Sequence, residues 1–377
     1  MRKKTKIIFI NDSYHSGGVE KIMQELVNHM PENEYEITIQ TNSSGKDFWN
    51  YYNKNISYYQ VNLLSSKFYK KNILLYKVIR KVLSYLEKKV RLFQINNKYD
   101  IAVAFKEGAS LNYVAKTKIR KFAWIHINYD AEHWTQRYYK DKTQEYEIMR
   151  KFEKVICVSE SVKRGVENHV GKLENLIVLM NPIDEKNVRE RAQLENVENI
   201  FIKNKISFLC VGRLNFAKAY DRLVFVSKRL ERIYDNFQIY IIGQGEEEKK
   251  IKALIEKENV NSIKLLGPYD NPYPYMKKTD WFLCCSIFEG FCTVLQEALI
   301  LEKPVITTDV GGARELFGDS EYGIVVENTE DALFNAMENV IKNSNIQKYY
   351  SAKVKERANI INVEESVNKI LALFKGK

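Results

Sequence analysis

Short apolar runs alternate with amphipathic stretches along most of the chain. Such runs are typical of strands that are buried in a sheet. Stretches with apolar residues three and four positions apart lie between them and predict helices. The alternation indicates an α/β fold with parallel sheets. The predicted strands are residues 6–11, 36–41, 100–105, 122–126, 155–158, 176–180, the start of 206–224, 238–242, 262–266, 281–285, 304–308 and 323–326.

The chain length and one proline-containing turn predict two domains. The chain has 377 residues, which is enough for two domains of ordinary size. An apolar run ends at Asn181–Asp184, where proline stops a strand, and the charged stretch 184–200 follows. We therefore predict a first domain over 1–182 and a second over 183–360. No internal repeat or low-complexity segment is evident.

The segment 286–315 places two carboxylates around the start of a predicted helix. Glu289 opens the loop Gly290–Cys292, a helical pattern begins near Thr293, and Glu297 follows. The glycine lets a ligand approach the backbone, and the free N–H groups of a helix start bind anions. Carboxylates would repel a phosphate, so they suit hydroxyl groups attached to it, as in a sugar nucleotide. An isolated pair of glutamates at this spacing would more simply be solvated.

Two cations follow a buried strand within the segment 206–224. Arg213 comes directly after the turn residue Gly212, and Lys218 lies five positions later, before a predicted helix. Both lie at the carboxyl end of a strand, where open α/β sheets bind ligands. Two fixed positive charges there would hold a diphosphate and stabilise it as it leaves. The alternative is a pair of ordinary surface cations on a loop.

A glycine pair follows the first predicted strand. Gly17 and Gly18 lead into a helix with one apolar face, and their backbone N–H groups would come near a bound phosphate or acceptor. The spacing differs from the dinucleotide pattern G-x-G-x-x-G, which argues against a nicotinamide enzyme. We interpret Gly243–Gly245, after another strand, as a strand-to-helix turn.

Residues 286–315 resemble the signature of the family 4 retaining glycosyltransferases, S-x-x-E-G-F-P-x-V-L-x-E-A-x-x-x-G-x-P-V-I-x-T-x-x-G-G-x-x-E. Cys292 replaces the family's proline and Glu302 a glycine. The family also reads V-G-R-L-x-x-x-K-G around the two cations, with Ala219 here in place of the last glycine, and G-G-x-E in its first loop. The matching positions of the long signature are Ser286, Glu289, Gly290, Phe291, Val294, Leu295, Glu297, Ala298, Pro304, Val305, Gly311, Gly312 and Glu315.

The resemblance implies a role for each of these groups. Glu289 would bind hydroxyls of the donor sugar, and Glu297 the ribose of the nucleotide. Arg213 and Lys218 would form the diphosphate-binding pair. The implied catalytic residues are His126, Arg213, Lys218 and Glu289. The implied donor-binding residues are Gly17, Gly18, Arg213, Lys218, Gly290, Phe291, Thr293, Val294 and Glu297.

His126 ends the strand-like run 122–126, and members of this family often carry a histidine there that faces the donor sugar. The alternative is a histidine satisfied by core hydrogen bonds; we favour the functional role. Asp130, Glu132 and His133 follow, but their spacing matches no metal-ligand pattern. We interpret them as an acceptor-side loop and predict no metal site.

The resemblance also implies the GT-B fold, two Rossmann-like domains facing each other across a cleft. Residues 1–182 would bind the acceptor, 183–360 the donor, and 361–377 would form a helix that packs back on the first domain. The implied reaction moves a sugar, with retention, from a nucleotide-diphosphate sugar that we expect to be UDP-linked. The acceptor would be a glycan or lipid-linked glycan of capsule, lipopolysaccharide or a similar polysaccharide. No cofactor or divalent cation is expected, because the cations and helix-start amides supply the charge.

Three other interpretations share this architecture. A glycogen-phosphorylase-like enzyme would need pyridoxal phosphate and a much longer chain. A sugar-nucleotide epimerase would lack an acceptor site. A non-catalytic partner subunit would usually lose a site charge, whereas all four of Arg213, Lys218, Glu289 and Glu297 are present. The sugar, the base and the acceptor stay open.

Cysteine usage and hydropathy predict a cytoplasmic protein. The five cysteines show no pairing framework or metal spacing, which favours a reducing compartment. The first apolar run is too short for a signal peptide, and no segment has the apolar length of a membrane span.

Basic charge is concentrated in the first half of the chain. Residues 1–180 carry 31 Lys and Arg against 19 Asp and Glu, whereas 181–377 carry 28 against 29. The segment 67–91 holds nine of these cations and one acidic residue, with apolar residues at helical spacing. Such a helix suits an anionic membrane surface, where each cation contributes roughly 1 kcal/mol. The alternative is a domain helix with a solvated face.

We therefore predict peripheral contact with the inner face of the cell membrane, where a polyprenyl-diphosphate-linked glycan would be a fitting acceptor. The predicted contact residues are Lys70, Lys71, Lys77, Arg80 and Lys81. Nucleic acid would also attract this charge, but no recognition motif for it is evident, and we predict no nucleic-acid partner.

Overall fold

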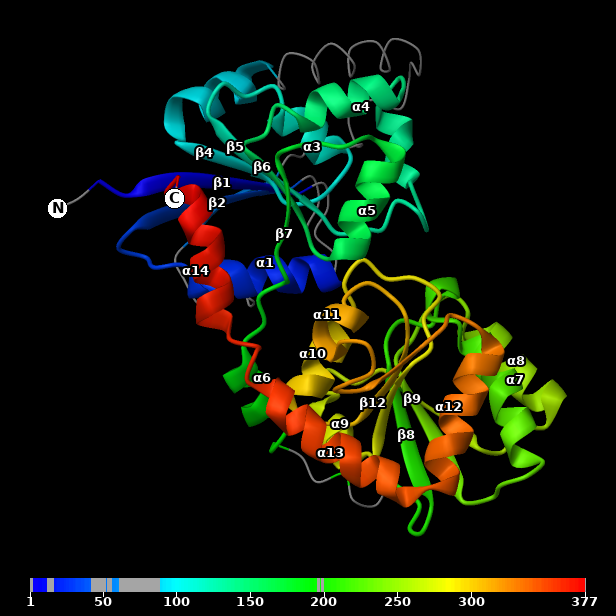
Figure 1. The fold of residues 1–377 in the computed structure, drawn as a ribbon. Coiled ribbons are helices and arrows are strands. Elements are labelled where there is room, and N and C mark those ends of the chain that lie inside the picture. The colour runs from blue at the N-terminus through cyan, green and yellow to red at the C-terminus, as the bar shows by residue number, and fades with distance from the viewer. Residues whose placement is uncertain are drawn as a thin grey trace, which may run out of the picture. The chain divides into compact units, whose positions relative to one another are not determined.

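A computed structural model of the protein describes residues 3–11, 17–41, 52, 56–60, 89–194, 197 and 200–376. The chain forms two compact units, each built around one parallel sheet (Figure 1). Unit 1 consists of Met1–Val158, Val162–Leu179 and Val367–Lys377, and unit 2 of Ser159–Ser161 and Met180–Ser366.

The sheet of unit 1 has the strand order β3-β2-β1-β4-β5-β6-β7, with all neighbours parallel. Its strands are β1 (Thr5–Asn11), β2 (Tyr35–Thr41), β3 (Ser57–Gln60), β4 (Ile101–Ala104), β5 (Arg120–Ile125), β6 (Lys154–Cys157) and β7 (Leu176–Val178). The accompanying helices are α1 (Gly18–His29), α3 (Ala109–Val114), the 3-10 helix η2 (Trp134–Tyr138), α4 (Lys142–Met149) and α5 (Glu160–His169).

The sheet of unit 2 has the order β10-β9-β8-β11-β12-β13, again with parallel neighbours. Its strands are β8 (Ile206–Val211), β9 (Phe237–Ile242), β10 (Ile263–Gly267), β11 (Trp281–Cys284), β12 (Val305–Thr308) and β13 (Ile324–Val326). Its helices are α6 (Glu185–Arg191), the 3-10 helix η4 (Phe216–Lys218), α7 (Tyr220–Glu231), α8 (Glu248–Glu258), α9 (Tyr273–Lys278), α10 (Thr293–Ile300), α11 (Ala313–Phe317), α12 (Glu330–Lys342) and α13 (Ser344–Ala358).

The central strands are buried on both faces, which explains why their sequences are continuous apolar runs. Every residue of β9 is buried, and in unit 2 it packs with the apolar faces of α7 and α12 in one core. Leu223 of α7 and Leu333 of α12 are fully buried there. Burying one such side chain contributes about 1.5–3 kcal/mol, so these helices are fixed on the sheet by their apolar stripes.

The predicted α/β fold is confirmed. Every predicted strand coincides with an observed one, with ends that differ by one or two residues. The strand β3 is not predicted, because its sequence, SYYQ, has no aliphatic run. The predicted basic helix 67–91 lies outside the described residues except at its end, where 89–98 are helical. Lys70, Lys71, Lys77, Arg80 and Lys81 therefore lie outside the described residues too.

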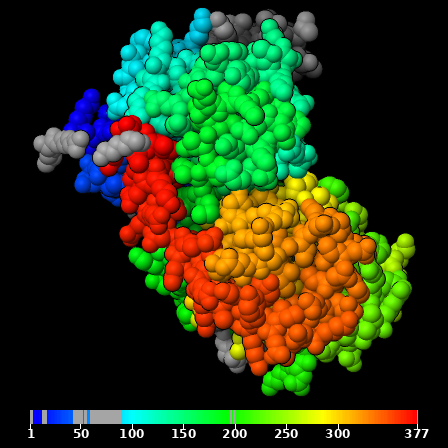
Figure 2. Space-filling model, viewed as in Figure 1, coloured from blue at the N-terminus to red at the C-terminus, as the bar shows by residue number. Residues whose placement is uncertain are grey.

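The C-terminal helix α14 (Val363–Phe374) starts in unit 2 and ends in unit 1, as predicted for this fold. Its first N–H group donates to Glu185 of α6 at 3.0 Å. At its other end, the Phe374 ring packs on Phe122 of β5, with ring centroids 5.0 Å apart. Figure 2 shows this end of the chain, in red, beside the blue N-terminal part of unit 1. There Lys375 pairs with Glu34 at 2.8 Å. Among the described residues, no helix is both long and apolar enough to cross a bilayer.

Candidate functional site

In each sheet the strands that follow one another in the chain are first added on one side of a central strand and then on its other side. The place where the side changes is the switch point of the sheet. In unit 2 that point lies between β8 and β11, because β9 and β10 extend the sheet on one side and β12 and β13 on the other. Loops at the carboxyl ends of such strands diverge and leave space for a ligand. The predicted cations follow β8, and the predicted carboxylates follow β11. The topology therefore brings both groups to one position.

The loop after β8 is shaped to present Lys218. A Cβ atom at Gly212 would lie 2.9 Å from Lys218 Cε, so glycine lets the lysine stem keep its observed position. The Asn215 side chain accepts from the Lys218 N–H at 3.3 Å and starts η4. Ala219 then adopts a left-handed φ of 51°, which costs a non-glycine residue roughly 1–2 kcal/mol. Glycine adopts this φ without strain, which explains the glycine of the family signature at this position. Ala219 makes the same turn in this chain.

Lys218 and Glu289 form an ion pair. Lys218 Nζ lies 2.6 Å from Glu289 Oε1, and both side chains are more than four-fifths buried, with 17% and 18% of their surface exposed. Ser286 donates to the same carboxylate oxygen at 2.8 Å. Burial alone would lower the pKa of Lys218, but the Glu289 carboxylate and the neighbouring Cys292, Cys284 and Tyr220 together raise that pKa well above its usual value. Lys218 is therefore a permanent cation at this point.

Arg213 is the second cation after β8 and is exposed. Its guanidinium makes no hydrogen bond or ion pair with the part of the chain that the structure describes. The backbone around it is fixed, because Leu214 N–H donates to Gln244 at 3.0 Å. Cβ atoms at Gly243 and Gly245 would lie 1.9 Å and 2.3 Å from the Gly212 and Leu214 carbonyl oxygens. These glycines thus allow two loops to pack, which agrees with their interpretation as a turn.

The loop after β11 is held by two residues that no sequence pattern singles out. Arg222 of α7 donates through Nη1 to Asn328 Oδ1 at 2.8 Å and through Nη2 to the Cys285 carbonyl. Asn328 in turn donates to the Ile287 carbonyl, and Ile287 N–H donates to Ala217 at 2.7 Å. Arg222 and Asn328 are about a hundred positions apart, so no local pattern indicates their contact.

Two glycines after β12 fix the start of α10. A Cβ atom at Gly311 would lie 2.1 Å from the Gly290 carbonyl oxygen, and one at Gly312 would lie 3.0 Å from the Phe291 ring. Cys292 N–H donates to the Gly311 carbonyl at 3.0 Å. The Cys292 side chain makes no capping hydrogen bond to the helix. Among the described residues none accepts from the first amides of α10, at Thr293 and Val294, and the N-terminal end of a helix attracts anions.

Glu297, the second predicted carboxylate, is 5% exposed on α10. Its Oε1 accepts from the Tyr273 hydroxyl at 3.1 Å, and the Arg191 guanidinium lies over the Tyr273 ring, 5.1 Å from its centroid. Tyr273 and Arg191 are not selected by the sequence pattern. They fix the orientation of the carboxylate, and its contact with a ribose stays a prediction.

His126 of unit 1 is 8% exposed and has partners within the protein. Its Nε2 lies 3.0 Å from the Phe105 carbonyl, and its own N–H donates to Glu107 at 3.0 Å. Burial lowers the pKa of His126 to about 3, although the Phe105 carbonyl opposes this. The ring is therefore a neutral histidine that donates to a core carbonyl. This geometry is that of the core-histidine alternative, and its catalytic role stays a prediction.

The segment 130–133 joins a buried network in unit 1. His133 Nε2 lies 3.1 Å from Glu145 Oε2, and its ring stacks on Tyr129 with centroids 4.0 Å apart. Burial lowers the pKa of His133 to about 4 and raises that of Glu145 to about 7. Asp130 instead lies 3.2 Å from His169. Within the described ranges, no three His, Cys, Asp or Glu side chains are grouped to hold a metal.

The glycine pair at the start of α1 is exposed. Gly17 occupies the N-cap without a side-chain cap, and a Cβ atom at Gly18 would meet nothing within 4 Å. Glycine is therefore not required at position 18 for packing in unit 1. Open backbone at a helix start fits the predicted ligand contact, which stays a prediction.

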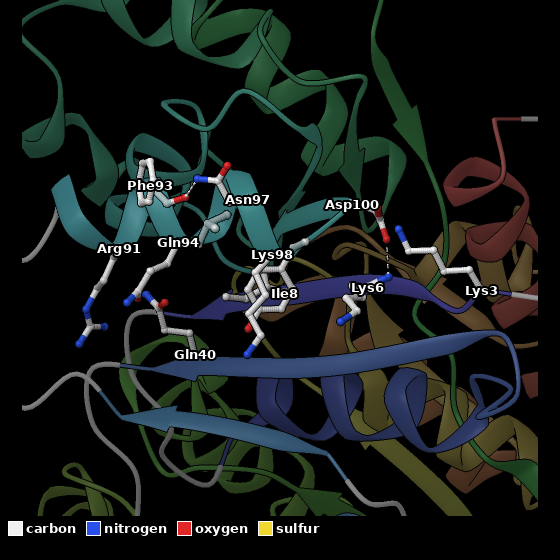
Figure 3. Close-up of a pocket in the computed structure, with 12 residues that line it drawn as sticks. Lys3, Lys6, Ile8, Gln40, Arg91, Phe93, Gln94, Asn97, Lys98 and Asp100 are labelled. Atoms are coloured by element: carbon white, nitrogen blue, oxygen red, sulfur yellow. Dashed lines mark hydrogen bonds between the residues drawn. The ribbon is translucent and has the colours of Figure 1, made fainter.

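A hollow of about 710 Å³ lies in unit 1 between the helical stretch 89–98 and the strands β1 and β2 (Figure 3). Figure 3 shows Arg91 and Lys98 reaching from the helix toward the strands, where Lys6 lies. One carboxylate, Asp100, lines it and accepts from the Lys6 N–H at 2.7 Å. The hollow is therefore basic. Phe93 lies at its rim, 70% exposed.

Two family models match this chain, each over slightly less than half of it. "Glycosyltransferase Family 4" matches residues 16–187, and "Glycosyl transferases group 1" matches residues 193–357. Together they cover most of both units.

Curated relatives point the same way. An N-acetylgalactosamine-N,N'-diacetylbacillosaminyl-diphospho-undecaprenol 4-alpha-N-acetylgalactosaminyltransferase of Campylobacter jejuni is 36% identical over 51% of this chain and 54% of its own length. The match thus spans about half of that relative. The amylovoran biosynthesis glycosyltransferase AmsD of Erwinia amylovora is 23% identical over 92% of both chains.

A solved structure agrees over the whole chain. Anabaena HepE, in complex with UDP, superposes with a TM-score of 0.79 at 18% identity and covers 99% of this chain and 100% of its own. A likeness at this identity concerns the fold. It fits two parallel Rossmann-like sheets of the GT-B type.

Proposed function

This chain belongs to the group 1 glycosyltransferases of family 4, and on that premise we propose that it moves a sugar from a nucleotide-diphosphate sugar to an acceptor hydroxyl. The observation that carries the proposal is the meeting of charges at the switch point of unit 2. There the Lys218–Glu289 pair, the exposed Arg213 and the start of α10 share one position. Cations for a diphosphate and a carboxylate for a sugar are what such a donor requires.

In the proposed mechanism, Arg213, Lys218 and the first amides of α10 hold the diphosphate. Negative charge grows on the phosphate oxygens as the bond to the anomeric carbon lengthens. Fixed cations and amides stabilise that charge without reorganisation, and stabilisation of this kind supplies much of the rate enhancement of many enzymes. These groups take the electrostatic part that a divalent cation has elsewhere, so we propose a metal-independent reaction. Retention of the anomeric configuration is proposed from family membership.

Glu289 and Glu297 would orient the rest of the donor. Lys218 and Ser286 both occupy Glu289 Oε1, and no group in the described part of the chain hydrogen-bonds Oε2. We assign that second oxygen to hydroxyls of the sugar. Glu297, oriented by Tyr273, is assigned to the ribose.

The names of the relatives support a UDP-linked donor and a lipid-linked acceptor. HepE binds UDP, and the Campylobacter enzyme acts on a diphospho-undecaprenol glycan. We propose that this chain likewise uses a UDP-sugar and a polyprenyl-diphosphate-linked glycan in the synthesis of a surface polysaccharide. AmsD, an amylovoran biosynthesis enzyme, supports the same role.

Peripheral membrane contact is proposed from charge. The basic hollow with Lys6, Arg91 and Lys98, and the exposed Phe93 at its rim, combine cations with an apolar side chain. This combination suits an interface of anionic headgroups and acyl chains. It continues the predicted basic helix, which ends in the same helical stretch.

The proposed function is tested with purified protein and a panel of UDP-, GDP- and ADP-sugars, with UDP-N-acetylgalactosamine included. Release of nucleotide that depends on a lipid-linked glycan acceptor is the expected result. Isomerisation of a sugar nucleotide without acceptor would instead indicate an epimerase. Failure to bind any of these donors by calorimetry would indicate a non-catalytic partner subunit.

A further inference from the structure

Two buried thiols meet directly beside the Lys218–Glu289 pair. Cys284 ends β11, Cys292 is the N-cap of α10, and their sulfur atoms lie 3.7 Å apart. Both residues are buried, with 5% and 2% of their surface exposed. Ser286, which donates to Glu289, lies 3.4 Å from Cys284 Sγ. A continuous chain of contacts thus joins Cys292 to the lysine.

The two thiols differ in acidity. The hydrogen bond with Cys292 lowers the pKa of Cys284 to about 6, against the effect of burial, and the Lys218 cation lowers it further. The same hydrogen bond and burial raise the pKa of Cys292 well above its usual value. At neutral pH the pair therefore contains one thiolate, which is nucleophilic, and one thiol that can attack it after oxidation.

We propose that Cys284 and Cys292 form a peroxide-reactive dithiol whose oxidation to a disulfide weakens nucleotide binding at the donor site. The family signature has proline at the position of Cys292, and a chain with proline there could not form this disulfide. The proposed disulfide therefore depends on the sequence of this chain and does not follow from its fold. The effect on nucleotide binding rests on the proposed function, whereas the thiol chemistry does not.

The reaction balances with hydrogen peroxide as the oxidant. The Cys284 thiolate attacks one peroxide oxygen, the O–O bond breaks, and hydroxide leaves to take up a proton as water. The resulting sulfenic acid is attacked by Cys292 sulfur, which forms the S–S bond and releases a second water. Two electrons pass from the two sulfurs to the peroxide. A thiol reductant reverses the change by exchange.

Oxidation would act on the site in two ways. The S–S bond, about 2.05 Å long, draws the start of α10 toward β11 and closes the loop that carries Glu289. The disulfide also removes the negative charge of the Cys284 sulfur. That charge attracts the Lys218 cation and helps to hold it in place. Both changes displace groups assigned to the diphosphate.

The test uses the full chain, treated with graded hydrogen peroxide and then freed of it. Peptide mapping should show a disulfide between Cys284 and Cys292, with the mass of two hydrogens lost. Calorimetry with UDP should show an affinity reduced about tenfold or more, equivalent to about 1.4 kcal/mol, and restored by dithiothreitol. The Cys292→Ser variant should lose no hydrogens, should accumulate a dimedone-reactive Cys284, and should lose less UDP affinity after peroxide than the unmodified chain loses.

The buried Cys157 of β6, in unit 1, serves as the control cysteine. Cys157→Ser should respond to peroxide as the unmodified chain does. Circular dichroism should show that each variant is folded. A second variant, Cys284→Ala, should form no disulfide, which repeats the test without the substitution at position 292. The dithiol is overturned if no disulfide forms, or if it forms between other cysteines. A Cys284–Cys292 disulfide with unchanged UDP affinity overturns the regulatory effect alone. Reduced protein that binds no UDP contradicts the proposed function and leaves the disulfide result intact.

Discussion

Glu289 holds the site together in the absence of a ligand. One of its carboxylate oxygens accepts from both Lys218 and Ser286, at 2.6 and 2.8 Å. The lysine is therefore already extended toward the position where we place the diphosphate, and little side-chain entropy is lost when a donor binds. Loss of this carboxylate would affect the sugar contact and the lysine together.

The cations are the first residues to test. Arg213→Ala and Lys218→Ala should each lower the turnover number about a hundredfold or more, because each removes a fixed charge from the leaving diphosphate. Lys228→Ala, which breaks an ion pair with Glu258 on α7 and α8, is the matched control and should transfer normally. Steady-state rates at saturating donor check this. Full activity in either site variant would remove that residue from its role.

The two carboxylates should differ in calorimetry with UDP and UDP-sugar. Glu297→Ala should weaken both ligands, because ribose is common to them. Glu289→Ala should weaken the sugar nucleotide more than UDP. Tyr273→Phe removes only the hydroxyl that orients Glu297 and should reproduce part of the Glu297→Ala loss. Equal losses for both ligands in Glu289→Ala would contradict its assignment to the sugar.

The buried histidine His126 should stay neutral throughout the physiological range. Its pKa in the folded protein is about 3, below the ordinary value of 6.5, so the unfolded chain binds a proton first. The stability that this residue contributes is present above pH 6.5 and is lost as the pH falls from 6.5 toward 3. Urea unfolding of the protein and of His126→Gln at several pH values measures this. The free energy of unfolding of the variant should fall less steeply as the pH falls. An identical pH dependence in both proteins would mean that His126 is not the group responsible.

The elements at the site depend on close backbone contacts that have no counterpart in a local sequence pattern. The strand prediction succeeds because a buried parallel strand is a continuous apolar run, as in β9. The cations and carboxylates can be selected because their chemical types recur at the ends of such runs. Arg222, Asn328 and Tyr273 are missed, since each acts through a hydrogen bond to a distant segment. The edge strand β3 is missed for want of an aliphatic run.

Gly311→Ala tests the contact between the loops after β11 and β12. Its methyl group would lie 2.1 Å from the Gly290 carbonyl oxygen, so the loop that carries Glu289 must move. UDP affinity should fall about tenfold or more, with a lower melting temperature. Gly18→Ala is the contrast, because its methyl group meets nothing within 4 Å. It should fold with unchanged stability, so any loss of transfer there reports a ligand contact. Unchanged UDP binding in Gly311→Ala would show that the loop tolerates displacement.

At the scale of the whole molecule, the charge asymmetry between the two halves is the property to test. The protein should co-sediment with vesicles that contain phosphatidylglycerol, and less so as salt rises, because exposed charges are screened over about 8 Å at physiological ionic strength. Replacing Lys70, Lys71, Lys77, Arg80 and Lys81 with glutamine should abolish this binding. Arg91→Gln with Lys98→Gln, in the basic hollow, should weaken it.

Transfer to a short soluble acceptor is the control for these variants and should persist. A protein that ignores anionic vesicles at low salt would show that the basic segment is the solvated face of a domain helix.

The path of α14 has a consequence for how the chain acquires its structure during synthesis. Phe374 closes on Phe122 and Trp124, and Arg120 donates to the Leu373 carbonyl at 3.1 Å. Unit 1 therefore lacks part of its core until residues that follow all of unit 2 have left the ribosome. A nascent chain of two domains normally completes the first while the second is still being made. Here the first unit waits, and a premature stop codon shortly before α14 would damage the amino-terminal unit, although that unit is encoded far upstream.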